Sequence, residues 1–197
     1  MNPITHLLIG WTVASAAPSL NRRERAMVTW ASVVPDIDGL GIIVDWATRG
    51  MGKPTDFWGE YHHTLAHNIG FALLVTIVAT VLARQKALTA ALVFLSFHLH
   101  LLGDLVGARG PDGDHWPIPY LRPFSNALQL EWAGQWALNA WPNIVLTGVL
   151  ILIALVLARR RSYSPVELFS RKADEVLVRT LRSRFPVKEA EHSRSCP

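Results

Sequence analysis

Between Trp132 and Ala158 the chain contains no charged residue, and the core of this stretch reads NIVLTGVLILIALVLA. A helix needs about 20 apolar residues to cross a bilayer, so this segment is long enough to span a membrane. It stops at Arg159, Arg160 and Arg161, and a basic flank of this kind typically lies in the cytoplasm. A buried helix of a soluble protein is the alternative interpretation. The basic stop favours an integral membrane protein.

The composition agrees with this interpretation. Half of the 197 residues are hydrophobic and only 17% are charged, which is too apolar for an ordinary soluble domain. The single cysteine, Cys196, excludes a disulfide framework and a thiolate metal cluster. Ten of the 19 Lys and Arg residues lie from Arg159 onward. The basic excess therefore belongs to the tail, and no nucleic-acid partner is expected.

Further apolar stretches predict a helical bundle. Residues 68–83 and 87–107 read as a helical hairpin whose short turn carries Arg84 and Lys86, while the stretches near 3–17 and 26–34 are short and need cross only in part. No basic segment precedes the first of them, so no removable signal peptide is expected. The predicted fold is all-α, an integral membrane bundle of about four to five apolar helices with a C-terminal amphipathic helix.

Two regions follow from this division. Residues 1–161 are expected to form a membrane-embedded helical domain, and residues 162–197 a basic cytoplasmic tail. Within the tail, apolar side chains fall near one stripe of a helix over 165–185, which predicts an amphipathic helix on an anionic leaflet. A solvated tail helix is the alternative, and the end of the chain is expected to be disordered.

Polar residues sort to the two ends of the predicted helices. The basic turns at 22–25, 84–86 and 159–161 fall at one end. The other end receives His6, Asp36, Asp38, His62, His63, His67, His100 and Asp104. By the positive-inside rule the basic end and the tail are cytoplasmic, and the His/Asp end faces the opposite side of the inner membrane. Tryptophans such as Trp58 and Trp116 lie in the loops at that end and read as an interfacial belt or as a substrate platform.

Histidine and aspartate in or near a membrane are candidates for function, because their burial is costly. Neutral imidazole and carboxylate together suit zinc or manganese. His100 and Asp104 are four residues apart, so they share a helix face, whereas His98 points elsewhere and is assigned to packing or to a supporting shell around the site. Asp36 and Asp38 alternate, so that they can ligate one ion, bridge two, or act as the base that takes a proton from water.

The segment YHHTLAHN supplies three more histidines. If it is all helix, His63 pairs with His67 at a spacing of four; if the helix begins near Thr64, His62 can approach the same ion from the preceding loop. His6 lies in the first turn of the first helix, at the same end. The sequence leaves the choice between His62 and His63 open.

These segments resemble one known pattern. THLLIG, PDID, His-x-x-x-x-His within YHHTLAHN, and His-x-x-x-Asp followed by WPIPYLRPFS are similar, in this order over about residues 1–125, to the YdjM-type family of bacterial inner-membrane metal-dependent hydrolases. The resemblance implies a metal site at His6, Asp36, Asp38, His62, His67, His100 and Asp104. The third motif departs from the family, since His63 replaces an Arg, Ala66 a Thr and Asn68 a Ser. A more distant similarity, to zinc-dependent phospholipase C and related nucleases, suggests phosphodiester chemistry.

The expected function is that of a membrane-bound hydrolase with one or two divalent ions, acting on a phosphoester or a lipid-linked substrate. His63 and His115 are candidates for orienting a leaving group or for alternative ligation. The rival hypothesis is a metal-binding membrane protein without turnover, used for transport or for structure. A haem protein and a simple packing role are weaker alternatives. Membrane lipids are the expected partners.

Overall fold

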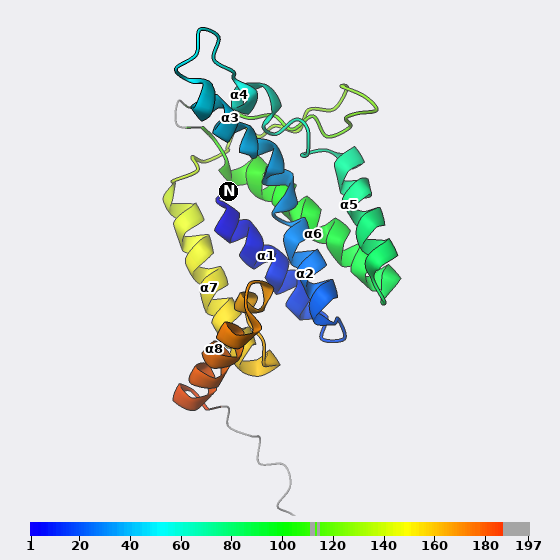
Figure 1. The fold of residues 1–197 in the computed structure, drawn as a ribbon, viewed down its shortest axis with the longest axis vertical. Coiled ribbons are helices and arrows are strands. Elements are labelled where there is room, and N and C mark those ends of the chain that lie inside the picture. Colours follow the sequence, from blue (N-terminus) through cyan, green and yellow to red (C-terminus); the bar gives the residue numbers. More distant parts are fainter. Residues whose placement is uncertain (111–112, 114, 187–197) are drawn as a thin grey trace, which may run out of the picture. The chain divides into compact units, whose positions relative to one another are not determined.

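The computed structural model describes residues 1–110, 113 and 115–186, and the predicted disorder of the last residues lies outside this range. Over the described residues the regular elements are all helical, which confirms the predicted class. The α-helices are α1 (Pro3–Ala16), α2 (Arg22–Ala31), α3 (Gly41–Thr48), α4 (Phe57–Tyr61), α5 (Ile69–Leu82), α6 (Lys86–Gly107), α7 (Trp141–Arg161) and α8 (Arg171–Arg184). Two 3₁₀ helices, η1 (Val34–Leu40) and η2 (Pro165–Leu168), interrupt them (Figure 1).

Side-chain caps begin several of these helices. The Asn2 side chain accepts from the Thr5 backbone N–H, and Pro3 occupies the first turn of α1. Asn21 and Glu24 form a reciprocal capping box at the start of α2. The Asn68 side chain accepts from the backbone N–H of Phe71 and starts α5. Each cap satisfies backbone donors that a helix start leaves free.

Fewer helices than expected are long enough to cross a bilayer. The helices α6 and α7 meet the requirement by length and composition, and α2 with residues 34–48 makes a third candidate if this pair, bent by 52°, counts as one span. Helices α1 and α5 have 14 residues each, or about 21 Å at 1.5 Å per residue, which is less than the roughly 30 Å hydrocarbon core. The prediction of four to five apolar helices was therefore somewhat too high for spanning segments.

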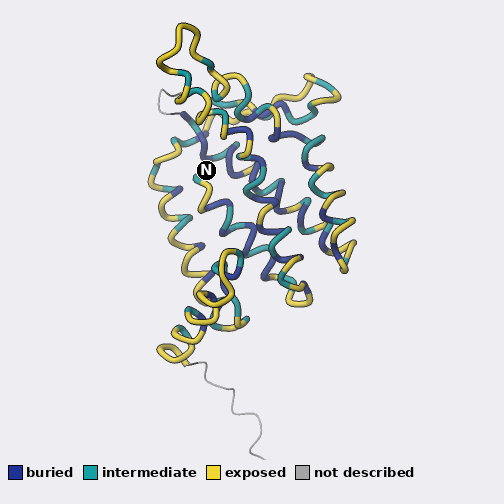
Figure 2. The backbone as a smooth tube through the Cα atoms, viewed as in Figure 1, coloured by how far each residue is buried: buried dark blue, intermediate teal, exposed yellow. Residues whose placement is uncertain are grey.

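The chain forms two compact units, Met1–Ile151 and Leu152–Pro197, and α7 continues from the first into the second. In the first unit α1, α2, α5 and α6 lie side by side (Figure 1). Small and medium side chains fill the space between them, including Ala14, Val28 and Val93, which are fully buried. Figure 2 shows this buried interior beside the exposed α3–α4 region.

A buried carboxylate joins the two basic turns of the first unit. Glu24 accepts hydrogen bonds from the backbone N–H groups of Arg84 at 2.9 Å and Gln85 at 2.7 Å, besides that of Asn21. These turns therefore lie together, while η1, the segment 62–68 and the C-terminal part of α6 lie at the other end of the same unit (Figure 1). Within this unit, the predicted sorting of basic turns and His/Asp clusters is what the structure shows.

The second unit contains the tail. The predicted helix over 165–185 is divided into η2 and α8, because Ser170 is extended and caps α8 through the Ala173 N–H. Asp174 accepts hydrogen bonds from the backbone and the hydroxyl of Ser164, at 2.7 and 2.5 Å. Arg182 donates to the carbonyl of Arg159 and to the hydroxyl of Ser162. These contacts hold α8 to the basic end of α7.

Candidate metal centre

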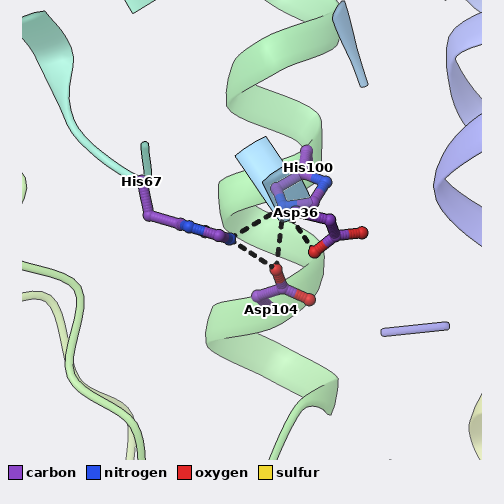
Figure 3. A group of neighbouring side chains, drawn as sticks. All are labelled: Asp36, His67, His100 and Asp104. Atoms are coloured by element: carbon purple, nitrogen blue, oxygen red, sulfur yellow. Dashed lines mark hydrogen bonds and ion pairs between the residues drawn. The ribbon is translucent and has the colours of Figure 1, made fainter. Parts of the chain in front are cut away.

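Four donor groups from three chain segments meet at one end of the first unit. Asp36 comes from η1, His67 from the irregular segment before α5, and His100 and Asp104 from adjacent turns of α6. One donor atom from each residue lies within 4.8 Å of all the others. Figure 3 shows the four side chains directed toward one another. His67, His100 and Asp104 are buried, and the Asp36 side chain is 23% exposed.

The hydrogen bonds of the two imidazoles determine which ring nitrogen faces the cluster. Nδ1 of His100 donates to the carbonyl oxygen of Ser32 at 2.9 Å, and Nδ1 of His67 donates to Asp38 at 3.0 Å. In a neutral ring the proton therefore lies on Nδ1 and the lone pair on Nε2. Second-shell bonds of this type are typical of histidines that bind metal ions.

The two Nε2 atoms lie only 3.0 Å apart. With Nδ1 protonated in both rings, two lone pairs face each other beside the Asp104 carboxylate, whose Oδ2 lies 2.9 Å from His100 Nε2 and 3.4 Å from His67 Nε2. Asp36 adds an oxygen 3.6 Å from His100 Nε2. Such a group of donors needs a cation at its centre, or a proton on one ring. Two imidazoles with two carboxylates fit zinc or manganese.

Without a metal ion, His67 is the residue that supplies positive charge to the cluster. Burial disfavours the charged ring, but the adjacent carboxylates of Asp104 and Asp38 outweigh burial and raise the pKa of His67 to about 9. By contrast, burial lowers the pKa of His63 well below the usual value, so this ring is neutral. The cluster thus favours positive charge at its centre.

Asp38 supports the cluster and is not one of the four converging donors. Its two oxygens accept hydrogen bonds from Nδ1 of His62 and Nδ1 of His67, both at 3.0 Å, and from the Ala66 backbone N–H at 3.1 Å. Asp36 and Asp38 therefore have different places in the site, although the sequence gives them equivalent candidate roles. Asp36 is one of the four donors, and Asp38 is hydrogen-bonded to the histidine segment. Asp38 fixes the irregular segment that carries the histidines.

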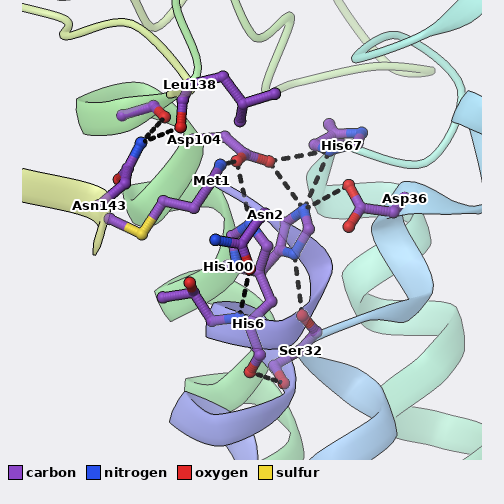
Figure 4. Close-up of polar contacts among 12 residues, drawn as sticks. Met1, Asn2, His6, Ser32, Asp36, His67, His100, Asp104, Leu138 and Asn143 are labelled. Carbon is purple, nitrogen blue, oxygen red and sulfur yellow. Dashed lines mark hydrogen bonds and ion pairs between the residues drawn. The ribbon is translucent and has the colours of Figure 1, made fainter. Parts of the chain in front are cut away.

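His6 lies on the opposite side of Asp104. Its Nε2 is 3.0 Å from Asp104 Oδ1, and its ring lies against that of His100 with centroids 3.9 Å apart and the planes tilted by 32°. The Met1 amino group also contacts this carboxylate (Figure 4). Gly103 permits the close approach, since a Cβ there would lie 3.0 Å from His6 Cε1. His6 thus contacts a member of the cluster without being one of the four.

The segment 62–68 is not helical, because α4 ends at Tyr61 and α5 begins at Ile69. The spacing of four between His63 and His67 therefore does not place them on one helix face. His63 is buried, has a left-handed backbone (φ 65°) and lies 3.9 Å from Asp104 Oδ2. Such a backbone is uncommon outside glycine and is found at functional sites. His62 stacks on Trp58 with centroids 4.0 Å apart.

The two remaining histidines lie outside the cluster. His98 bonds to the Phe94 carbonyl and to the Tyr120 hydroxyl, both at 2.8 Å, as the packing interpretation expects. His115 lies 3.9 Å from Glu131. Within the part of the chain that the structure describes, neither is hydrogen-bonded or ion-paired to any of the four donors.

Two contributions to the site have no sequence signature. The Ser32 carbonyl that orients His100 is a backbone group, and Gln135, which donates to the Asp104 carbonyl at 2.7 Å, comes from a loop distant in the chain. Gly103 does carry a signal, because a glycine inside a helix often marks a close approach.

A cavity of about 240 Å³ reaches the cluster and is lined by Asp36 and Asp104 together with His62 and His63.

Comparison with known proteins gives one assignment. No curated protein and no solved structure matches the chain. The sequence model of the YdjM inner membrane protein family matches residues 1–174, which include every residue of the cluster and its supporting groups. The apolar helices and the buried His/Asp cluster thus belong to a matched region that covers most of the sequence, and the chain is a member of the YdjM inner membrane protein family.

Proposed function

We propose that the protein is a membrane-bound metal-dependent hydrolase that acts on a phosphoester or a lipid-linked substrate. The observation that carries the proposal is the 3.0 Å approach of His67 Nε2 and His100 Nε2, with both Nδ1 atoms bonded to oxygen. A catalytic metal site combines a few protein ligands with open access for water and substrate. The cavity beside Asp36 and Asp104 offers that access.

His67, His100, Asp104 and Asp36 would hold a divalent ion, zinc or manganese, which supplies Lewis-acid activation of water at near-neutral pH. The chain's own groups have separable tasks. Asp38 orients His67 through a hydrogen bond. Asp36 is the most exposed member of the cluster and lines the cavity, so its carboxylate is suited to accept a proton from water. His63 lines the same cavity, and its neutral imidazole can donate a hydrogen bond to a leaving group.

We further propose that the cluster faces away from the cytoplasm. In the first unit it lies at the end opposite to the basic turns around Arg22 and Arg84 (Figure 1). Basic turns favour the cytoplasmic side of the membrane. The Arg159–Arg161 stop of α7 would then leave the tail in the cytoplasm.

The test is the metal content of detergent-purified protein by elemental mass spectrometry. Wild type is expected to hold about one or two zinc or manganese ions per chain, and the His67→Ala, His100→Ala double variant none. His98→Ala is the matched control, because His98 lies on the same helix but bonds to Tyr120. Loss of metal in the double variant alone would justify a screen of phosphodiester and phospholipid substrates.

Two results would contradict the proposal. Absence of metal from wild type, even after reconstitution with zinc and manganese, would remove the basis of the hydrolase. Bound metal without hydrolysis of any phosphoester would favour the alternative of a structural or transport site.

A further inference from the structure

An apolar groove runs between α2 and α5. Its volume is about 280 Å³, and its lining is almost entirely apolar. The lining includes Met27 and Trp30 of α2 and Phe71, Leu74, Val78 and Leu82 of α5. From Phe71 to Leu82 the helix rises by about 16 Å. Leu74 and Val78 are about half exposed, so this surface needs an apolar occupant.

A second cavity adjoins the groove at the N-terminal end of α5. This cavity measures about 400 Å³ and shares Phe71 and Leu74 with the groove. Here the lining becomes mixed, since Arg122 and Thr64 join the apolar side chains. Arg122 is the one charged residue lining either cavity among the described residues. A positive charge therefore lies where the apolar groove ends.

Two more cavities continue toward the metal cluster. Thr64 also lines a cavity of about 290 Å³, whose walls include Trp58, His62, His63 and Trp116. The same four side chains line the cavity of about 240 Å³ that reaches the cluster. Trp116 meets the rings of both histidines edge-on, with centroids 5.2 and 5.0 Å apart. The two cavities thus adjoin through one aromatic wall.

We propose that these four adjoining cavities form a single seat for an anionic phospholipid of the surrounding membrane. An acyl chain lies in the groove between α2 and α5, and the phosphate of the head group lies between Arg122 and the cluster. Apolar side chains recognise the chain by burial, and the guanidinium recognises the phosphate by charge-assisted hydrogen bonds. The assignment of this lipid as the substrate class rests on the proposed function, whereas its binding does not.

The test uses phosphatidylglycerol with a photoactivatable diazirine in one acyl chain, incorporated in phosphatidylcholine nanodiscs with the purified full-length protein. After illumination, labelled peptides are mapped by mass spectrometry. Labelling is expected at 27–34 and 71–82, the two walls of the groove. Leu74→Trp, which fills the junction of the first two cavities, should reduce it about tenfold, equivalent to roughly 1.4 kcal/mol of lost affinity.

Leu73→Trp is the matched control. Leu73 neighbours Leu74 on α5, is 42% exposed against 53%, and lines none of the four cavities. Labelling of the groove should stay at the wild-type level in this variant. Equal loss in both variants, or equal labelling around the whole of α5, would overturn the proposal, because it would indicate ordinary boundary lipid.

Metal content separates this proposal from the proposed function. Leu74→Trp should retain the metal, since Leu74 does not contact the cluster. Groove-specific labelling of a protein that binds no metal would support the lipid seat and exclude the lipid as a substrate. Full metal content without groove-specific labelling would overturn the seat and leave the metal centre in place.

Discussion

The carbonyl oxygen of Ser32 accepts a hydrogen bond from Nδ1 of His100, with 2.9 Å between the two atoms. The Ser32 hydroxyl also donates to the His6 carbonyl at 2.6 Å. The first residue after α2 therefore connects α1 and α6 next to the cluster. The packing of α1 on α2 thus positions His100, a candidate metal ligand that neither helix contains.

Gly10 allows this packing. A Cβ at position 10 would collide with the Ser32 side chain and lie 2.7 Å from the Thr29 carbonyl. We expect Gly10→Ala to lower the free energy of unfolding by about 1–3 kcal/mol, as overpacking does, and to reduce bound metal by displacing Ser32. The measurements are thermal unfolding in detergent and metal content. Gly148→Ala in α7 is the control, since nothing lies within 4 Å of its Cβ; it should be neutral or stabilising by up to about 1 kcal/mol.

Asp38 gives a second prediction. Asp38→Asn keeps the shape but removes the charge from the group that orients His62 and His67. We expect the affinity for zinc to fall about 10–100-fold, the usual effect of losing such a partner. A competition titration with a chelating dye measures it. Asp56→Asn should keep wild-type affinity, because Asp56 caps α4 through the Gly59 N–H and Asn caps equally well. Equal affinity in both variants would remove Asp38 from the support of the site.

Glu24 gives a prediction about stability. Its carboxylate is buried and accepts from three backbone N–H groups in two turns. Glu24→Ala leaves these donors without their partner. We expect a loss of at least about 3 kcal/mol, since hydrogen bonds to charged groups contribute about 1.5–3 kcal/mol each. Thermal unfolding in detergent tests this. Glu60→Ala, in the exposed part of α4, should change stability by less than about 0.5 kcal/mol. Similar losses in both would contradict the role of Glu24.

Sidedness can be tested with single cysteines in a Cys196→Ser background. Lys53 and Ser19 are both exposed, and they lie in the α3–α4 region and in the turn before α2. A membrane-impermeant maleimide should label Lys53→Cys in intact spheroplasts, and Ser19→Cys only after permeabilisation. The reason is that Arg22, Arg23 and Arg25 follow Ser19, and basic flanks favour the cytoplasmic side of the membrane. Labelling of both from the same side would contradict the proposed orientation.

The sequence predicted the parts of the fold that depend on local pattern. Uncharged apolar runs with basic ends identify α6 and α7, and a spacing of four places His100 and Asp104 on one face of α6. The lengths of α1 and α5 were harder to judge from the sequence. The apolar runs include residues outside the helices, and caps such as Asn68 determine where each helix begins. The grouping of His/Asp residues at one end also followed from the pattern of turns.

The different tasks of the candidates could not be read from the sequence. Asp36 and Asp38 are two residues apart, and only the tertiary fold turns one toward His100 and the other toward His62 and His67. Whether His62 or His63 approaches the cluster depends on the irregular backbone between α4 and α5. That backbone is held by Asp38 through the Ala66 N–H, a contact between residues 28 positions apart.

The shared carboxylate of Asp38 has a consequence for regulation of the centre. One oxygen holds His67, which faces the cluster, and the other holds His62, which stacks on Trp58 in the cavity wall. A molecule that shifts the aromatic wall must therefore also bias the orientation of His67. By thermodynamic reciprocity, a molecule bound in the cavity and a divalent ion bound in the cluster would change each other's affinity by the same factor.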